Sequence, residues 1–325
     1  MAPSRYDSIY KSSLLAGKVV LVTGGGTGIG RCIAHELASL SCTVVIAARR
    51  LSPLLKTQEE IGAAGYEGRC DVLHPLDIRD HEQCKKAIQD VVRKWGRLDG
   101  LVNNAGGQFP SPAEKISPKG WRSVVDLNLT GTFFMAQAAY EGYMKENGGS
   151  IVNVIVDMWN GWYWVAHSAA ARAGVYNLTR TLAQEWTPHS GVRINCVAPG
   201  AIIGAGQSNY PPSVQKKVIE SFSYQNPSGR LGTESEVSSA IVFLLTPGAS
   251  YINGACINVD GGQSIRQGPI FDTVFSPDSK LPIYHGFGSP SPDDDLGMGP
   301  GFRELFGRMA AIKPPGDAEK GKSNL

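Results

Sequence analysis

Hydrophobic residues follow two alternating spacings along the chain from Lys18 to about Ile265. Short apolar runs of strand length alternate with longer amphipathic segments of helix length, beginning with a run at 19–24, a helix-like segment at 29–40 and a run at 43–49. This alternation is the βαβ rhythm of a parallel sheet, whose strands are buried on both faces. Further candidate strands lie at residues 74–78, 100–106, 149–156, 193–200 and 255–262.

Seven strands separated by helices predict an α/β fold, with one doubly wound parallel sheet of the Rossmann type and helices on both faces. After about Ile265 the pattern gives way to Pro, Gly, Ser and Asp, apart from a short helix-like stretch at 302–311. We therefore expect an N-terminal arm at 1–16, a single domain at 17–265, and a polar, partly disordered C-terminal extension at 266–325.

The composition narrows the class of protein. Hydrophobic residues make up 42% of the chain and charged residues 18%, and the 39 glycines indicate a compact, turn-rich protein. The formal charge is only +2 and the first 260 residues contain no long basic run, so we expect no nucleic-acid partner. A small acidic cofactor fits this charge better.

The six cysteines are scattered, without a Cys-x-x-Cys pair or a histidine cluster, so we expect reduced, buried thiols and no metal site. The sequence contains no apolar run of the roughly 18 residues that a membrane span needs. The N-terminal residues also lack the apolar middle of a signal peptide. These features predict a soluble, intracellular protein without a membrane span.

A glycine-rich run, Thr23 to Gly30, joins the first predicted strand to the first predicted helix. Without side chains, such a turn lets backbone N–H groups and the helix N-terminus approach a pyrophosphate, whose negative charge the helix dipole favours. Glycine turns are also common where no phosphate binds, so the run alone leaves both interpretations open. The candidate phosphate-binding residues are Gly24, Thr27, Gly28, Ile29 and Gly30.

The end of the second predicted strand indicates which dinucleotide would bind. An acid there would accept a hydrogen bond from a ribose 2′-hydroxyl, whereas a basic residue would pair with a 2′-phosphate. This chain has Ala48, Arg49 and Arg50, and Arg49 offers a two-pronged fork to a phosphate. NADP(H) is therefore the expected cofactor, and the alternative is that the two arginines only solvate a loop.

Three later motifs stand at matching positions of the fold. Asn103 to Gly106 closes the fourth strand, Asp77 ends the third, and Pro199-Gly200 follows the sixth. With these motifs, residues 17–263 resemble the short-chain dehydrogenase/reductase family. The resemblance implies that Asp77 and Ile78 hold the adenine, that Asn104 touches the adenosine ribose side, and that residues 199–202 line the nicotinamide. The cofactor-binding residues it adds are Asp77, Asn104, Ala105, Gly106, Pro199, Gly200 and Ile202.

The catalytic positions depart from that family's usual pattern of a Ser, a Tyr and a Lys four residues after the Tyr. Residues 153–156 read Asn-Val-Ile-Val where the Ser is expected, and Ser168 to Arg172 stands where Tyr-x-x-x-Lys would open the fifth helix. Only Asn128 keeps its family identity. An alternative alignment takes Tyr176 and Arg180 as the pair, but it lies two helical turns late, where a side chain normally packs against a neighbouring helix.

A lost Tyr and Lys point to a different reaction. Reduction of a carbonyl needs a proton donor on its oxygen, whereas reduction of a conjugated C=C bond does not. In an enoyl thioester, negative charge develops on the thioester oxygen, which Arg172, Ser168 and Asn128 could stabilise. The α-carbon would then take its proton from a weaker acid or from water.

Residues 165–179 strongly resemble the peroxisomal trans-2-enoyl-CoA reductases, as do residues 107–109 and 128–133, and the related 2,4-dienoyl-CoA reductases share the altered site. Asp157 occupies the place of the proton-donating Tyr of mitochondrial-type dienoyl-CoA reductases, so it is a candidate acid; the other interpretation is an exposed loop residue. His167 is either a donor to the thioester oxygen or a helix cap. The aromatic side chains at 159 and 162–164 line an acyl-CoA site or pack as a lid.

The last three residues, Ser323, Asn324 and Leu325, differ at one position from the Ser-Lys-Leu peroxisomal signal. They predict a peroxisomal location through the import receptor, and otherwise a cytoplasmic one. The family resemblance implies a homodimer or homotetramer through the fourth and fifth helices. The leading hypothesis is NADPH-dependent reduction of a trans-2-enoyl-CoA; the alternatives are 2,4-dienoyl-CoA reduction and a catalytically silent NADP-binding partner protein.

Overall fold

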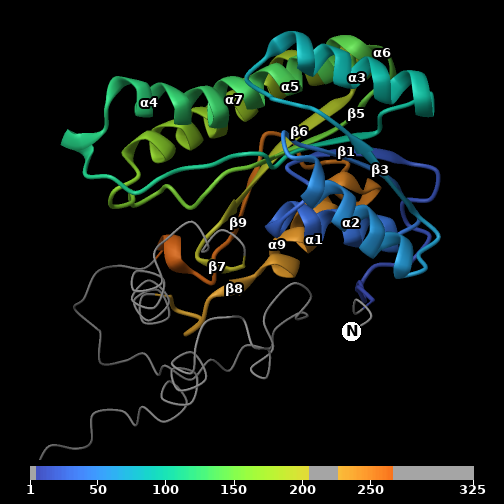
Figure 1. The fold of residues 1–325 in the computed structure, drawn as a ribbon, viewed down its shortest axis with the longest axis horizontal. Coiled ribbons are helices and arrows are strands. Elements are labelled where there is room, and N and C mark those ends of the chain that lie inside the picture. The colour runs from blue at the N-terminus through green and yellow to red at the C-terminus, as the bar shows by residue number, and fades with distance from the viewer. Residues whose placement is uncertain (1–4, 205–225, 266–325) are drawn as a thin grey trace, which may run out of the picture.

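Seven parallel strands form the central sheet of the computed structural model, which describes residues 5–204 and 226–265. The strand order is β3-β2-β1-β4-β5-β6-β9, and Figure 1 shows the twisted sheet between its helices. This order confirms the predicted doubly wound α/β fold. The strands are β1 (Val19–Thr23), β2 (Thr43–Ala47), β3 (Arg69–Leu73), β4 (Gly100–Asn103), β5 (Gly149–Val154), β6 (Val192–Pro199) and β9 (Cys256–Val259).

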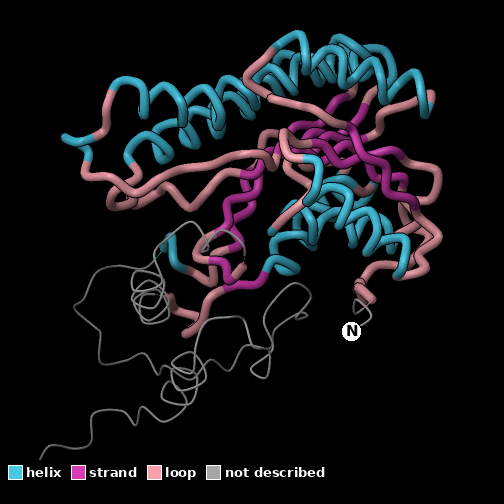
Figure 2. Tube along the Cα trace, in the orientation of Figure 1, coloured by secondary structure: helices cyan, strands magenta, loops and turns pink. Residues whose placement is uncertain are grey.

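Helices cover both faces of this sheet (Figure 2). On one face lie α1 (Gly28–Ser39), α2 (Leu51–Ala63) and α9 (Glu234–Leu245). On the other lie α3 (His81–Trp95), a continuous helical run from Pro118 to Asn147, and α7 (Ala166–Ser190). The continuous run consists of α4 (Pro118–Val125), a π-helical turn η2 (Asp126–Thr130), α5 (Gly131–Ala139), a second π-helical turn η3 (Tyr140–Met144) and α6 (Lys145–Asn147).

The first strand shows why its sequence is apolar without interruption. Val20 and Val22 belong to the core on the α1 side, whereas Val19 and Leu21 belong to the core on the α3 side. Successive side chains of a strand point to opposite faces, so a strand covered on both faces needs apolar residues at every position. The burial of all five residues of β1 confirms this interpretation.

The predicted third strand at 74–78 is wrong. The structure places β3 at Arg69–Leu73, and the peptide between His74 and Pro75 is cis. Proline lacks the N–H that a ladder needs, so pairing stops before it. The true strand was missed because it is partly exposed and carries Arg69 and Asp71. As a result, Asp77 lies in the loop beyond β3 and not at the end of the strand.

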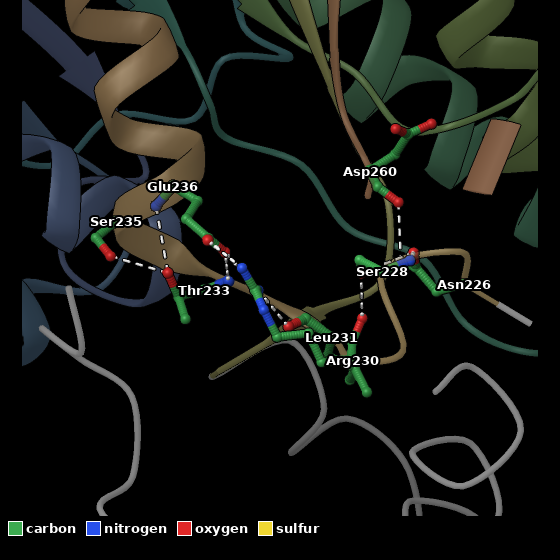
Figure 3. Close-up of polar contacts among 8 residues, drawn as sticks. All are labelled: Asn226, Ser228, Arg230, Leu231, Thr233, Ser235, Glu236 and Asp260. Atoms are coloured by element: carbon green, nitrogen blue, oxygen red, sulfur yellow. Dashed lines mark hydrogen bonds and ion pairs between the residues drawn. The ribbon is translucent and has the colours of Figure 1, made fainter. Parts of the chain in front are cut away.

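A second, two-stranded parallel sheet joins β7 (Ile202–Ile203) to β8 (Gly232–Thr233), and the sequence did not predict it. The segment before β8 is held by side-chain contacts drawn in Figure 3. The Asn226 amide donates to the carbonyl of Asp260 at 2.9 Å, and Arg230 pairs with Glu236 at 2.6 Å. These contacts fix residues 226–233 beside the carboxyl ends of β6 and β9.

The described part of the N-terminal arm packs onto the domain. Tyr6 and Ser8 donate hydrogen bonds to the buried carboxylate of Glu36 on α1, and the Tyr10 hydroxyl donates to the carbonyl of Ser239 on α9. The C-terminal extension, the helix-like stretch at 302–311 and residues 323–325 lie outside the described residues. Among the described helices, none has both the length and the apolar character that crossing a membrane requires.

Candidate active site

The glycine run after β1 folds into a tight turn that only glycine can form. Gly24 and Gly28 have φ values of +70° and +58°, in the left-handed region that favours glycine. A Cβ on Gly30 would lie 2.3 Å from the carbonyl oxygen of Gly24 and 2.4 Å from Nδ2 of Asn104. The backbone of the turn therefore packs closely against the segment that follows β4.

The N-terminus of α1 differs from those of α3, α4 and α9. Each of those helices is capped by a side chain, namely Asp80, Ser117 and Thr233, whereas Thr27 makes no side-chain cap and the first turn of α1 contains no acid. Uncapped N–H groups at a helix start, beside a glycine turn, form an anion site. Residues Gly24, Thr27, Gly28, Ile29 and Gly30 thus fit the pyrophosphate of a dinucleotide.

Asn104, the residue after β4, supports this turn. Its side-chain amide donates to the carbonyl oxygens of Thr23 at 3.0 Å and Gly24 at 3.3 Å, and its backbone N–H donates to the Thr23 hydroxyl at 3.1 Å. The adjacent Ala105 N–H donates to the same hydroxyl at 3.0 Å. The side-chain amide of Asn104 thus holds the glycine turn. The contact of Asn104 with the adenosine ribose stays a prediction.

The side chains expected around the adenosine lie just after β2 and in the loop after β3. Arg49 and Arg50 are exposed directly after β2, and no ion pair joins Arg49 to any carboxylate in the described ranges. Ile78 is buried against Gly131 of α5, where a Cβ would lie 2.6 Å from Cγ1 of Ile78. The basic strand end that favours a 2′-phosphate is therefore open to solvent.

The nicotinamide segment, Pro199 to Ile202, leaves the carboxyl end of β6. The Gly200 N–H donates to the carbonyl of Val259 on β9 at 3.0 Å, and a Cβ on Gly200 would lie 2.8 Å from that of Asp260. Ile202 pairs with Gly232 in the small sheet. This segment is held in place by backbone contacts on both sides.

Asn128 joins the helical run to the loop after β4. Its side chain forms two reciprocal hydrogen bonds with Gly107: Nδ2 donates to the carbonyl at 2.8 Å, and Oδ1 accepts from the N–H at 3.0 Å. Asn128 is fully buried within the π-helical turn η2. These two bonds show that Asn128 positions the 106–107 loop, and its role toward a substrate stays a prediction.

Arg172 is a buried guanidinium on α7. Nη1 donates to the carbonyl of Val154 at the end of β5 at 2.8 Å, and Nη2 lies against Gly106, where a Cβ would be only 2.0 Å away. Nε has no hydrogen-bond partner, and within residues 5–204 and 226–265 no carboxylate pairs with this side chain. Burial lowers the pKa of Arg172 to about 10, so the group is still charged at neutral pH.

Two further predicted residues lie at the start of α7. Ser168 is buried one turn before Arg172, on the same side of the helix. His167 is not a cap before the helix, because α7 begins at Ala166 and Val165 occupies the N-cap position without a side-chain cap. Nδ1 of His167 accepts from the Ser168 N–H at 2.8 Å, and its ring meets Phe109 edge to face at 4.5 Å. Burial lowers the pKa of His167, so this side chain is neutral at physiological pH.

Asp157 is not the exposed loop residue of the alternative interpretation, because its side chain is only 3% exposed. Its N–H donates to the carbonyl of Pro199 at 2.9 Å, which places it beside the nicotinamide segment. Burial raises the pKa of Asp157, and the nearby carboxylate of Asp260 raises it further. Sequence reasoning missed Asp260, since a lone Asp before two glycines reads as a turn residue.

Tyr176 lies one helical turn after Arg172 on α7 and packs against aromatic and apolar side chains. Its ring packs edge to face on Trp159 at 5.1 Å and beneath the guanidinium of Arg180 at 5.6 Å, in a hydrophobic cluster with Ile155 and Val175. The structure therefore brings Arg172, Asn128 and Gly106 together and leaves Tyr176 in a packing position.

The loops after β4 and β5 run side by side, since the Ser111 N–H donates to the carbonyl of Trp164 at 2.7 Å. Trp164 has a positive φ of +66°, and it and Tyr163 are exposed on the loop that precedes α7. Trp159 is anchored instead, since its indole N–H donates to Oδ1 of Asn258 at 3.1 Å. Of the four predicted aromatic residues, Trp159 is anchored by this bond, Trp162 is half-buried, and Tyr163 and Trp164 are exposed.

A doubly wound parallel sheet with a glycine turn before its first helix is the architecture of dinucleotide-binding proteins. The chain belongs to the short-chain dehydrogenase/reductase family. Residues 24–264 match the family model described as enoyl-(acyl carrier protein) reductase.

Individual relatives share most of the chain. A Bacillus subtilis protein named probable 2,4-dienoyl-CoA reductase is 40% identical over 254 residues, which cover 78% of this chain and 98% of that protein. The rat peroxisomal 2,4-dienoyl-CoA reductase is 35% identical over 261 residues, covering 80% and 88%. Among solved structures, a citronellol catabolism dehydrogenase from Pseudomonas aeruginosa is 44% identical with a TM-score of 0.70, covering 80% of this chain and all of that one.

Proposed function

We propose that this protein is an NADPH-dependent reductase of the conjugated C=C bonds of acyl-CoA thioesters, with a 2,4-dienoyl-CoA as its substrate. The observation that carries this proposal is Arg172, a buried cation with an unpartnered Nε at the position where the family usually places a proton-relaying lysine. A guanidinium donates hydrogen bonds but does not release its proton near neutrality. The site therefore suits a reaction that needs charge stabilisation on an oxygen.

When NADPH is bound, its nicotinamide supplies a hydride to the far end of the conjugated system. Negative charge then develops on the thioester oxygen, and Arg172, together with the Ser168 hydroxyl, stabilises it. Arg172 is held for this task by the Val154 carbonyl and by the loop that Asn128 clamps. Because the donors are fixed before the substrate arrives, little reorganisation accompanies the reaction.

Asp157 is the proposed donor of the proton that the α-carbon of the substrate takes up. A carboxyl group whose pKa is raised by burial stays protonated to a higher pH than an exposed one, which suits a general acid. Its backbone bond to Pro199 supports a position beside the nicotinamide segment. Tyr176 is the less favoured donor, because its ring is packed on Trp159.

The names of the relatives support a dienoyl substrate, since both the bacterial and the peroxisomal proteins are called 2,4-dienoyl-CoA reductases. A trans-2-enoyl-CoA is the second candidate, favoured by the enoyl reductase description of the matching family model. The two substrates develop charge on the same thioester oxygen, so the same donors serve both.

Cofactor, location and assembly complete the proposal. Exposed Arg49 and the lack of an acid at the end of β2 support NADPH over NADH. The Ser-Asn-Leu end and the peroxisomal relatives support import into peroxisomes through the import receptor, with the cytoplasm as the alternative. The family resemblance supports a homodimer or homotetramer through the helical run 118–147 and α7 as part of the proposal.

The test is to incubate the purified protein with NADPH and a series of 2,4-dienoyl-CoA and trans-2-enoyl-CoA thioesters, and to follow NADPH absorbance. We expect oxidation of NADPH with the dienoyl series, and its loss in Arg172→Ala with retained NADPH binding by fluorescence. A protein that binds NADPH but reduces neither series would instead be the catalytically silent partner.

A further inference from the structure

A carboxylate lies beside Arg49 although β2 itself ends without an acid. The loop after β3 runs along the end of β2, where the Leu76 N–H donates to the carbonyl of Ala48 at 3.2 Å. This bond brings the loop that carries Asp77 to the end of β2. Hydrogen bonds from Arg79 are the main cause that lowers the pKa of the Asp77 carboxyl, and the positive charge of Arg49 lowers it further. The position proposed for a 2′-phosphate therefore has a negative charge in its neighbourhood.

Arg79 neutralises that carboxylate. Its Nε donates to Oδ1 of Asp77 at 2.9 Å, its Nη2 donates to Oδ2 at 2.5 Å, and its backbone N–H donates to Oδ1 at 3.1 Å. This two-pronged arrangement is the strongest geometry for an arginine and a carboxylate. The two side chains remain 38% and 26% exposed, so the pair borders the solvent-facing edge of the cofactor site.

An unpaired Asp77 would oppose a 2′-phosphate, which carries close to two negative charges. The repulsion would act on NADPH but not on NADH, which has only a hydroxyl at that position. Arg49 alone would then have to offset both the phosphate and the carboxylate. Because Arg79 neutralises Asp77, the positive charge of Arg49 attracts the phosphate without an opposing carboxylate.

We propose that Arg79 is a specificity-determining residue for the phosphorylated dinucleotide, acting by shielding Asp77 and not by touching the phosphate. This inference rests on the proposed use of NADPH. It assigns the dinucleotide preference to Arg49 after β2 and to Asp77 and Arg79 in the loop after β3. Arg49 attracts the phosphate, Asp77 would repel it, and Arg79 cancels that repulsion.

The test measures the dissociation constants of NADPH and NADH by fluorescence, without substrate, for the wild type, Arg79→Gln, Asp77→Asn and the double variant. We expect Arg79→Gln to weaken NADPH binding by about threefold to tenfold at low salt and NADH binding by less than about twofold. Asp77→Asn should restore the ratio of the two constants in the double variant, because no carboxylate then remains to be shielded. The effect should shrink as salt rises.

Arg49→Gln is the matched control: it should lose NADPH selectivity, and Asp77→Asn should not fully restore it. Equal loss of both cofactors in Arg79→Gln would overturn the proposal in favour of a structural role. Selective loss without rescue by Asp77→Asn would overturn it in favour of direct contact with the phosphate. If the wild type binds NADH more tightly than NADPH, the proposed use of NADPH is wrong. The change in the NADPH dissociation constant between the wild type, the two single variants and the double variant would still show whether Arg79 shields Asp77.

Discussion

Gly106 shows how a single missing side chain builds the site. In the sequence it is the last residue of a family motif, and the structure gives the physical reason: a Cβ there would lie 2.0 Å from Nη2 of Arg172 and 2.7 Å from Oδ1 of Asn128. Backbone proximity of this kind has no signal in a hydrophobic pattern. The close approach of the buried Arg172 explains why this position holds a glycine.

Gly106→Ala should therefore displace the guanidinium and lower kcat by about a hundredfold or more, in line with the loss of one oxyanion donor. NADPH affinity should fall much less. Gly107→Ala is the matched control, because its Cβ would meet only Leu127 at 3.4 Å, an ordinary contact. Steady-state kinetics and NADPH titration check both variants, and equal kcat losses in the two would contradict the displacement of Arg172.

The pH dependence of the reaction tests Asp157 as the acid. Burial raises the pKa of this carboxyl, and a general acid works only while protonated, so kcat should fall as pH rises through that raised pKa. Asp157→Asn should lower kcat and remove this limb of the profile. A pH profile that is identical in Asp157→Asn would assign the proton to water or to Tyr176.

At the scale of elements, the pattern of hydrophobic residues predicted six of the seven strands within a few residues. It succeeded because a strand covered on both faces needs apolar residues throughout, as in β1. It failed for β3, whose partly exposed residues Arg69 and Asp71 removed the apolar signal. The small sheet of β7 and β8 was missed because two-residue strands have no periodicity.

The placement of α7 against the sheet depends on a buried chain of polar side chains that the sequence did not reveal. Asn103 on β4 donates to Asn153 on β5 at 2.9 Å, and Asn153 donates to the hydroxyl of Thr179 on α7 at 2.9 Å. All three side chains are buried. These hydrogen bonds connect α7, which carries Arg172, to β5 and β4.

Thr179→Val should leave the Asn153 amide without its partner and lower the free energy of unfolding by about 1–3 kcal/mol. Thr181→Val is the control on the same helix, since the Thr181 hydroxyl makes only an exposed bond to the Asn177 carbonyl; its effect should stay within about 0.5 kcal/mol. Urea denaturation compares the two. Equal effects would show that the buried chain contributes nothing beyond helix propensity.

At the scale of the whole molecule, the proposed cofactor site is assembled from segments that lie far apart in the sequence. The glycine turn after β1, the arginine after β2, Asn104 after β4 and the Pro199 segment after β6 meet at one edge of the sheet because parallel strands end on the same side. A ligand that contacts all of them binds only the folded domain. Binding should therefore stabilise the domain as a unit.

NADPH at about a hundred times its dissociation constant should add about 2.7 kcal/mol to the free energy of unfolding. For a domain of this size, that corresponds to a rise in Tm of about 5–10 °C. In Arg49→Gln the same NADPH concentration should give a smaller rise, because the lost phosphate contact lowers the affinity, whereas the rise with NADH should be unchanged. The exposed position of Arg49 makes this variant safe for the fold. Differential scanning fluorimetry measures all four shifts, and a loss of both cofactors' effects in Arg49→Gln would mean that this arginine holds the adenosine as a whole and does not select the phosphate.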